Sequence, residues 1–158
     1  MKTRVLIVGG GFAGASAAAA LAKNDQFKVT LIEEEKVPGV HSSGRNASMA
    51  RRVIEDPLLS KLACMSLEGI RRLEIESGVR LMSAEGGLLI GRSSDIESLY
   101  RSASVVPELK SDMQLLDRHG LTGNVSVLEE AESDAGIATS ECGVVDIHAL
   151  LSHYFHLA

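Results

Sequence analysis

The sequence predicts an α/β fold that opens with a parallel βαβ unit, and three observations indicate it. Residues 5–8 are β-favouring and run straight into the glycine spacing G-x-G-x-x-G over residues 9–14. The alanine-rich stretch 15–22 follows at once and favours a helix. A second apolar run, residues 29–32, then ends in an acid, Glu33. Strand, turn, helix and second strand are therefore present in the order that a parallel βαβ unit requires.

The glycines of the motif, Gly9, Gly11 and Gly14, have separate physical roles. Gly9 allows a sharp turn off the strand, and Gly11 omits the Cβ that would hold a pyrophosphate away from the backbone. Gly14 allows the helix to pack closely on the sheet, and the helix N-terminus offers free N–H groups to phosphate oxygens. Glu33 stands where a carboxylate would bind ribose hydroxyls. The pattern predicts a site for a dinucleotide pyrophosphate; the alternative is a glycine-rich turn that binds nothing.

The composition is that of an ordinary globular protein. The chain has 158 residues, of which 45% are hydrophobic and 23% are charged. Its net charge of -5, without a Lys/Arg-rich run, argues against nucleic acid as a partner. Two cysteines, Cys64 and Cys142, cannot form a disulfide framework and indicate reduced thiols. With no signal sequence and no membrane span visible, we expect a cytoplasmic protein.

Alternating helices, strands and turns are predicted for the rest of the chain. They are a helix within residues 48–54, a helix from Asp56 and Pro57 to Ser77 that Gly78 ends, a hairpin of strands 79–83 and 88–90, a helix from the capping box at Ser94 and Glu97 toward Ser102, a helix from Pro107 that Gly120 ends, a strand over 124–128, an acidic linker over 129–134 with loose chain up to Gly143, and a final helix capped by Asp146. The pair His153 and His156 has no acidic or thiol partner at matching spacing, so no metal site is expected.

Residues 41–47 form a small, polar stretch, His-Ser-Ser-Gly-Arg-Asn-Ala, ahead of the predicted helix 48–54. Hydroxyls and a glycine before a helix N-terminus are suited to a second phosphate contact, and equally to a plain N-cap. From these residues alone both interpretations stay open.

The glycine motif, Glu33 and the segment Ser42-Ser43-Gly44-Arg45-Asn46-Ala47 together resemble the N-terminal part of the FAD-dependent amino-acid oxidase superfamily. That group includes D-amino acid oxidases and dehydrogenases, glycine and sarcosine oxidases and flavin-linked glycerol-3-phosphate dehydrogenases. The resemblance continues through the helix that begins at Asp56-Pro57, the segment 86–91 and the segment 143–146, so it covers essentially the whole chain.

The resemblance implies FAD as the cofactor, held by a set of residues near the N-terminus. The implied cofactor-binding residues are Gly9, Gly11, Phe12, Ala13, Gly14, Glu33, Glu34, Ser42, Ser43, Gly44, Arg45 and Asn46. Within this set the glycines line the pyrophosphate, Glu33 holds the ribose, and Ser43, Arg45 and Asn46 lie along the pyrophosphate and ribityl chain. One departure is Glu34, since many relatives carry a basic residue directly after the ribose acid.

Three regions are expected: the N-terminal part of a Rossmann-like FAD-binding domain over 1–55, the start of a mixed α+β substrate-side region over 56–142, and a return toward the FAD domain over 143–158. A doubly wound nucleotide domain needs about five parallel strands, and two are predicted here. We therefore expect the front part of a larger flavoenzyme, truncated before its catalytic residues, inactive by itself and inclined to self-associate through exposed apolar surface.

The resemblance implies that the whole protein oxidises an amine or amino acid, of the D-amino acid, glycine or sarcosine type, by hydride transfer to flavin. One alternative is a flavin-linked dehydrogenase of a hydroxy compound such as glycerol 3-phosphate or a 2-hydroxy acid. Another is a non-catalytic module that binds a nucleotide or a partner protein. No catalytic residue can be assigned from this sequence.

Overall fold

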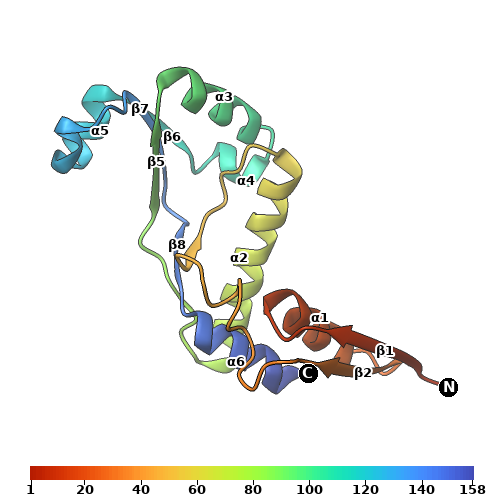
Figure 1. Ribbon diagram of the computed structural model, residues 1–158. Coiled ribbons are helices and arrows are strands. Elements are labelled where there is room, and N and C mark those ends of the chain that lie inside the picture. Colours follow the sequence, from red (N-terminus) through yellow and green to blue (C-terminus); the bar gives the residue numbers. More distant parts are fainter. The chain divides into compact units, whose positions relative to one another are not determined.

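The computed structural model describes every residue from Met1 to Ala158, and the chain forms two compact units (Figure 1). The first unit is Met1–Ser48 with Val145–Ala158, and the second is Met49–Val144. A parallel strand pair lies in the first unit and antiparallel strands lie in the second. The expected α/β class with a mixed α+β part is confirmed.

The first unit is built on the βαβ unit that the sequence predicts. Its elements are β1 (Thr3–Val8), α1 (Phe12–Ala22), β2 (Phe27–Ile32) and α6 (Ile147–Leu157). The strands pair in parallel, from Thr3 opposite Phe27 to Val8 opposite Ile32. Buried alanines on α1 give the helix a small cross-section, and it packs against β2 and α6.

One face of the parallel strand pair has no covering element in this chain. Leu6, Val8 and Ile32 project from it and are 61%, 77% and 47% exposed. Val8 and Ile32 are direct partners in the register, so these side chains form a continuous apolar strip. Parallel sheets are normally covered on both faces, so the exposure of these apolar side chains is unusual for a parallel sheet.

The second unit contains two small antiparallel sheets and their helices. Its elements are β3 (Met49–Ala50), α2 (Pro57–Ser77), β4 (Met82–Ser83), β5 (Gly87–Gly91), α3 (Ser93–Ala103), α4 (Pro107–Lys110), β6 (Gln114–Asp117), α5 (Arg118–Asn124), the 3-10 helix η1 (Ser126–Glu130), β7 (Ala135–Thr139) and β8 (Gly143–Val145), of which the last residue belongs to the first unit. One sheet has the order β3-β8-β4. The other has the order β5-β7-β6, and its strands are labelled in Figure 1.

The long helix α2 follows the prediction closely. The Asp56 side chain accepts hydrogen bonds from the backbone N–H groups of Leu58 and Leu59, and Pro57 occupies the first turn. Gly78 ends the helix in the left-handed conformation, at φ 70°. The final helix is likewise capped by its predicted residue, since Asp146 accepts from the Ala149 N–H at 2.8 Å.

The central strand of the second sheet, β7, is the element that the sequence analysis missed. The prediction had an acidic linker and loose chain here because Ala135, Gly136 and Ala138 have weak strand preference. In the structure the helix α5 and the strand β5 lie close to this strand: a Cβ on Gly136 would lie 2.6 Å from a Leu121 methyl carbon of α5 and 2.8 Å from the Leu89 carbonyl oxygen of β5. Small residues are required by packing at this position.

The predicted hairpin of strands 79–83 and 88–90 is wrong. β4 belongs to the β3-β8-β4 sheet, whereas β5 pairs antiparallel with β7, from Gly87 opposite Thr139 to Gly91 opposite Ala135. The turn at Gly86 does adopt a left-handed φ of 80°, but the chain leaves it toward a different sheet. Partners distant in the sequence outcompete the local pairing.

The predicted helix within 48–54 is also wrong, because Met49 and Ala50 form β3 opposite Val144 and Gly143 of β8. Because no helix begins there, the interpretation of residues 41–47 as its N-cap is wrong too. The predicted helix from Pro107 stops at Lys110, and residues 124–128 form the end of α5 and part of η1 instead of a strand.

The capping box at Ser94 is wrong as well. Arg92 is the N-cap residue of α3 and makes no side-chain cap bond. The first N–H of the helix, that of Ser93, instead donates to the Asp134 carboxylate at 2.6 Å. A carboxylate distant in the sequence therefore replaces the local cap.

The core of the second unit joins α2, α3, α4 and the β5-β7-β6 sheet. Its buried residues are Val53, Cys64, Ile96, Ala103, Val106, Leu109, Met113, Ala135 and Ile137. Both cysteines are buried free thiols. None of the helices combines the length and apolar character that crossing a membrane requires.

A buried arginine lies beside this core. Arg52 is 3% exposed and forms ion pairs with Asp112 and with Glu141, whose carboxylate also contacts Arg71 at 3.3 Å. Burial by itself would raise the pKa of Asp112, but hydrogen bonds from Ser140 and the charge of Arg52 outweigh it and hold that pKa below its usual value. The network joins β3, α2 and the connections that flank β6 and β7.

We predict that Asp112→Asn lowers the free energy of unfolding at neutral pH by about 2 kcal/mol, because the buried Arg52 charge loses a carboxylate partner. The folded pKa of Asp112 is depressed, so its stabilising contribution is full above the unfolded pKa of roughly 3.9 and is lost as pH falls through the lower folded value. Urea unfolding should show the difference between wild type and variant shrinking below about pH 4. Asp25→Asn, at an exposed partner of Lys2, is the control and should change little. A difference that stays constant with pH would contradict this account.

Candidate nucleotide-binding site

The turn between β1 and α1 requires glycine at two positions, Gly9 and Gly14. Gly9 has φ 101°, a left-handed conformation that side chains rarely adopt. A Cβ on Gly14 would lie 1.9 Å from the Gly9 carbonyl oxygen and 3.3 Å from a methyl carbon of Ile7. The sequence analysis assigned Gly14 to helix–sheet packing, and the structure shows that the turn itself imposes the tighter constraint.

The N-terminus of α1 presents unpaired donors. The Ala15 N–H bonds to the Gly11 carbonyl at 2.9 Å, so the N–H groups of Phe12, Ala13 and Gly14 come before the first helical bond, and those of Ala13 and Gly14 have no acceptor. No side chain of the N-cap residue covers them, and the first turn has no acidic residue. Such a helix end favours an anion through its free donors and its dipole.

Ser43 lies directly against this helix end. Its hydroxyl oxygen accepts a hydrogen bond from the Phe12 N–H at 3.0 Å. The same oxygen is 2.7 Å from the position that a Cβ on Gly11 would occupy. The glycine loop and the 41–47 loop, thirty residues apart in the sequence, therefore meet at one point.

Glu33, at the end of β2, reaches back to the glycine loop. Its carboxylate accepts hydrogen bonds from the Gly10 N–H at 2.5 Å and from the Glu35 N–H at 3.0 Å. These backbone donors, first that of Glu35 and then that of Gly10, hold the pKa of Glu33 below its ordinary value. The side chain is thus an oriented, ionised acceptor beside the helix end. Glu34 points to solvent and makes no such contact.

The rest of the 41–47 loop is folded on itself. The Gly44 N–H donates to the His41 carbonyl at 3.0 Å, and a Cβ on Gly44 would lie 2.6 Å from the Gly39 carbonyl oxygen. Arg45 donates through Nε to the Val40 carbonyl at 3.1 Å and is exposed at the surface. Ser42 is exposed as well, with its carbonyl 3.3 Å from the Asn46 amide nitrogen.

Two features of this site were missed by the sequence analysis. His41 Nε2 lies 3.0 Å from a Glu35 carboxylate oxygen and links the strand end to the loop. From α6, the Phe155 ring approaches the Cβ position of Gly10 to 3.3 Å, and Leu151 approaches that of Gly39 to 2.5 Å. The sequence signal for this contact was the apolar pair Leu151 and Phe155, which lie four residues apart and therefore on one face of the final helix.

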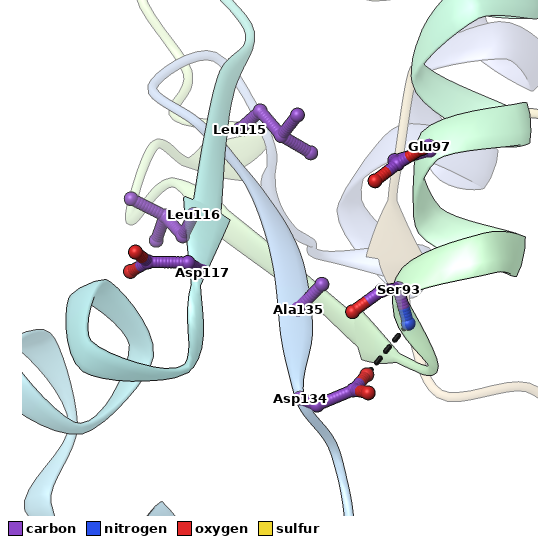
Figure 2. A pocket seen from close by; sticks show the side chains of 7 residues that line it. All are labelled: Ser93, Glu97, Leu115, Leu116, Asp117, Asp134 and Ala135. Carbon is purple, nitrogen blue, oxygen red and sulfur yellow. Dashed lines mark hydrogen bonds between the residues drawn. The ribbon is translucent and has the colours of Figure 1, made fainter.

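The second unit has cavities of its own, one of about 360 Å³ between α3 and the β6 and β7 strands (Figure 2). Two of its three carboxylates, Asp134 and Asp117, already have structural partners, and the third is that of Glu97. Asp134 accepts from the Ser93 N–H, shown dashed in Figure 2, and Asp117 accepts from the Gly120 N–H at 2.8 Å. The remaining lining is largely apolar, including Leu115, Leu116 and Ala135. This cavity therefore provides no matched set of catalytic groups.

A family model described as FAD dependent oxidoreductase (DAO) matches residues 4–158. The chain belongs to this DAO family. Its cofactor is FAD, as the family description states, and the expected family and cofactor are confirmed. No curated protein sequence matches the chain.

Solved structures of several dehydrogenases and oxidases share this fold. L-proline dehydrogenase from P. horikoshii matches with a TM-score of 0.81 and 20% identity over 99% of this chain and 41% of its own. L-alpha-glycerophosphate oxidase from Mycoplasma pneumoniae, with FAD bound, gives 0.78 and 19% over 99% and 42%. Glycine oxidase from Geobacillus kaustophilus gives 0.72 and 22% over 98% and 44%. The chain thus spans well under half the length of the structures it matches.

The residues of this site fit the adenosine and pyrophosphate part of FAD. The glycine loop has no Cβ at Gly11, the N-terminus of α1 has free N–H donors, and Glu33 is an ionised acceptor next to both. A pyrophosphate needs donors and close backbone approach, whereas a ribose diol needs an acceptor. Both requirements are met within one compact unit.

We predict that Gly11→Val weakens binding of FAD or ADP by roughly a hundredfold, the loss expected when two phosphate hydrogen bonds of about 1.5 kcal/mol each are blocked. The valine also forces Ser43 away from the helix end, since the Cβ position is 2.7 Å from its hydroxyl oxygen. Titration calorimetry measures the affinity. Gly69→Val is the matched control, because nothing lies within 4 Å of that Cβ position. Equal affinity in Gly11→Val and wild type would remove Gly11 from the site.

Proposed function

We propose that this chain is the N-terminal, FAD-holding part of a flavoenzyme that oxidises the carbon–nitrogen bond of an amine or amino acid. The observation that carries the proposal is the Glu33 carboxylate, held at 2.5 Å by the Gly10 N–H beside the free helix end of α1. It pairs a ribose acceptor with a phosphate donor site, as a dinucleotide requires. FAD, when bound, supplies the chemistry by accepting a hydride from substrate.

The proposed roles of individual residues follow their positions. Gly9, Gly11 and Gly14 shape the turn so that phosphates reach the N–H groups of Ala13 and Gly14, while the Phe12 N–H is held by Ser43. Arg45 keeps guanidinium donors free beyond its bond to the Val40 carbonyl, which suits it to the pyrophosphate charge. Ser42 and Gly44 form the turn that presents Ser43. Glu34 lies next to the ribose acid and adds negative charge at the adenosine end.

The amine or amino-acid substrate is supported by the similar structures, which include a proline dehydrogenase and glycine oxidases. A second candidate, oxidation of a hydroxy compound, is favoured by the similarity to the glycerophosphate oxidase. We propose that residues 56–142 begin the substrate-side region and that 143–158 return to the FAD part. Groups that orient substrate are then expected from sequence that these 158 residues do not contain.

We predict that Glu33→Ala weakens FAD and ADP binding about tenfold, the cost of one hydrogen bond of about 1.5 kcal/mol to a charged acceptor. It should also reduce the preference for FAD over NADP, because the carboxylate repels a 2′-phosphate. Fluorescence titration with both ligands measures this. Glu34→Ala is the neighbouring control and should have a smaller effect, since that side chain makes no contact with the glycine loop. Equal effects of the two variants would contradict the assignment.

We predict that the 158-residue chain alone binds FAD substoichiometrically and shows no turnover. The natural reading frame that contains it should carry yellow flavin, absorbing between roughly 350 and 500 nm, and reduce a dye with substrate. The substrate panel is D-amino acids, glycine, sarcosine and glycerol 3-phosphate, so it also separates the two candidate functions. Stoichiometric flavin with turnover in the short chain would contradict this prediction.

The same preparation tests self-association. The uncovered strip of Leu6, Val8 and Ile32 and the open strand edges of β1 and β2 favour association of the short chain. Light scattering at increasing concentration should give a rising mass, and Val8→Lys should reduce it. A constant monomer mass would count against this surface as a site of association.

A further inference from the structure

The side chain of Asn46 is bound entirely by the loop that contains it. Its amide nitrogen donates to the Ser43 carbonyl at 2.7 Å and to the Ser42 carbonyl at 3.3 Å. Its amide oxygen accepts from the Ser48 N–H at 2.6 Å. An asparagine amide has two N–H donors, and both of the bonds that this amide nitrogen makes go to carbonyls of the loop.

These bonds hold the residue whose hydroxyl meets the helix end. The shortest donor bond of Asn46 reaches the Ser43 carbonyl, and the Ser43 hydroxyl accepts the Phe12 N–H at 3.0 Å. A Cβ on Gly11 would lie 2.7 Å from that hydroxyl oxygen, so the space for it is narrow. A small rotation of the loop would remove the Ser43 hydroxyl from this position.

The acceptor side of Asn46 supports an unusual backbone conformation. Ser48 has φ 58°, the only left-handed residue of the chain that is not glycine. Its N–H is held by the Asn46 side chain, and its carbonyl accepts from the Val145 N–H at 2.8 Å. Asparagine side chains stabilise turns in this way by bonding to the backbone two residues on. Asn46 therefore fixes the loop from both ends.

We propose that Asn46 is a positioning residue that holds the Ser43 hydroxyl at the N-terminus of α1, instead of contacting the cofactor itself. As far as FAD affinity is concerned, the inference rests on the proposed function. The positioning of Ser43 is a property of the chain alone and can be measured without FAD.

The decisive measurement is hydrogen exchange of the Phe12 amide in the chain without added cofactor, followed by NMR. Ser43→Ala removes the acceptor of that amide and should speed its exchange about tenfold, as expected for loss of one hydrogen bond. Asn46→Ala should speed the same amide by a similar factor, although it removes no atom that touches Phe12. An unchanged Phe12 exchange rate in Asn46→Ala would overturn the inference.

Two further variants serve as a control and as a second test of the role of Asn46. Asn24→Ala is the matched control, since the Asn24 side chain accepts from the Gln26 N–H at 2.9 Å in a turn of the same unit. It should leave the Phe12 rate unchanged. Asn46→Asp keeps the acceptor for Ser48 but sets a carboxylate against the carbonyls of Ser42 and Ser43, so it should speed Phe12 exchange even if the alanine variant does not fold. A wild-type rate in a folded Asn46→Asp variant would also overturn the inference.

A double-mutant cycle in FAD affinity then separates positioning from direct contact. If Ser43→Ala and Asn46→Ala each weaken binding about fivefold, the double variant should also be near fivefold, because both changes remove the same contact. A roughly twenty-fivefold loss, the product of independent effects, would mean that Asn46 touches FAD directly and would overturn the inference. Absence of FAD binding in every natural form of the wild-type protein would instead overturn the proposed function, and the exchange data would still decide the role of Asn46.

Discussion

The close approach of Gly14 to the Gly9 carbonyl oxygen is the constraint on which the nucleotide site depends. Any Cβ at Gly14 would meet that oxygen at 1.9 Å, far inside a van der Waals contact. Because Gly14 is in the first turn of α1, this approach decides where the helix begins and where its free N–H groups point. The direction of α1 in turn decides which residues can reach those donors.

The 41–47 loop is fitted to this helix end by the same kind of steric allowance. A Cβ on Gly44 would lie only 2.6 Å from the Gly39 carbonyl oxygen, so glycine allows the close approach of these two segments. In the same way, the absence of a Cβ at Gly11 leaves room for the Ser43 hydroxyl. Polar atoms within the loop bond to one another, so the loop keeps its shape although most of it is exposed to water. A surface loop with internal bonds can present a side chain to a helix end without burial in a core.

The second unit is held by different forces. Its core is apolar, and the buried Arg52 charge at its side is compensated by Asp112 and Glu141. A buried charge without a partner would destabilise the fold. The ion pairs of Arg52 therefore hold together the chain after β3 and the segments that contain Asp112 and Glu141. The first unit has few buried large side chains and relies on alanine packing and backbone bonds, whereas its uncovered strip of Leu6, Val8 and Ile32 leaves apolar surface open.

The sequence by itself determined the local elements that depend on nearby residues. The glycine turn, the cap and stop of α2 and the Asp146 cap could be predicted because each arises from contacts within a few residues. The βαβ unit could be predicted because its whole pattern is contiguous in residues 3–32. The family and its cofactor could also be predicted from the sequence, because the motif at residues 9–14 is short and contiguous.

Tertiary structure alone decided the pairing of β5 with β7, the strand at Met49–Ala50 and the meeting of Ser43 with Phe12. Each of these joins segments from thirty to almost a hundred residues apart. Weak local preference, as in the small residues of β7, is overridden when distant segments leave no room for a side chain, as at Gly136. That is why propensity predicted a loose linker where the fold places its central strand.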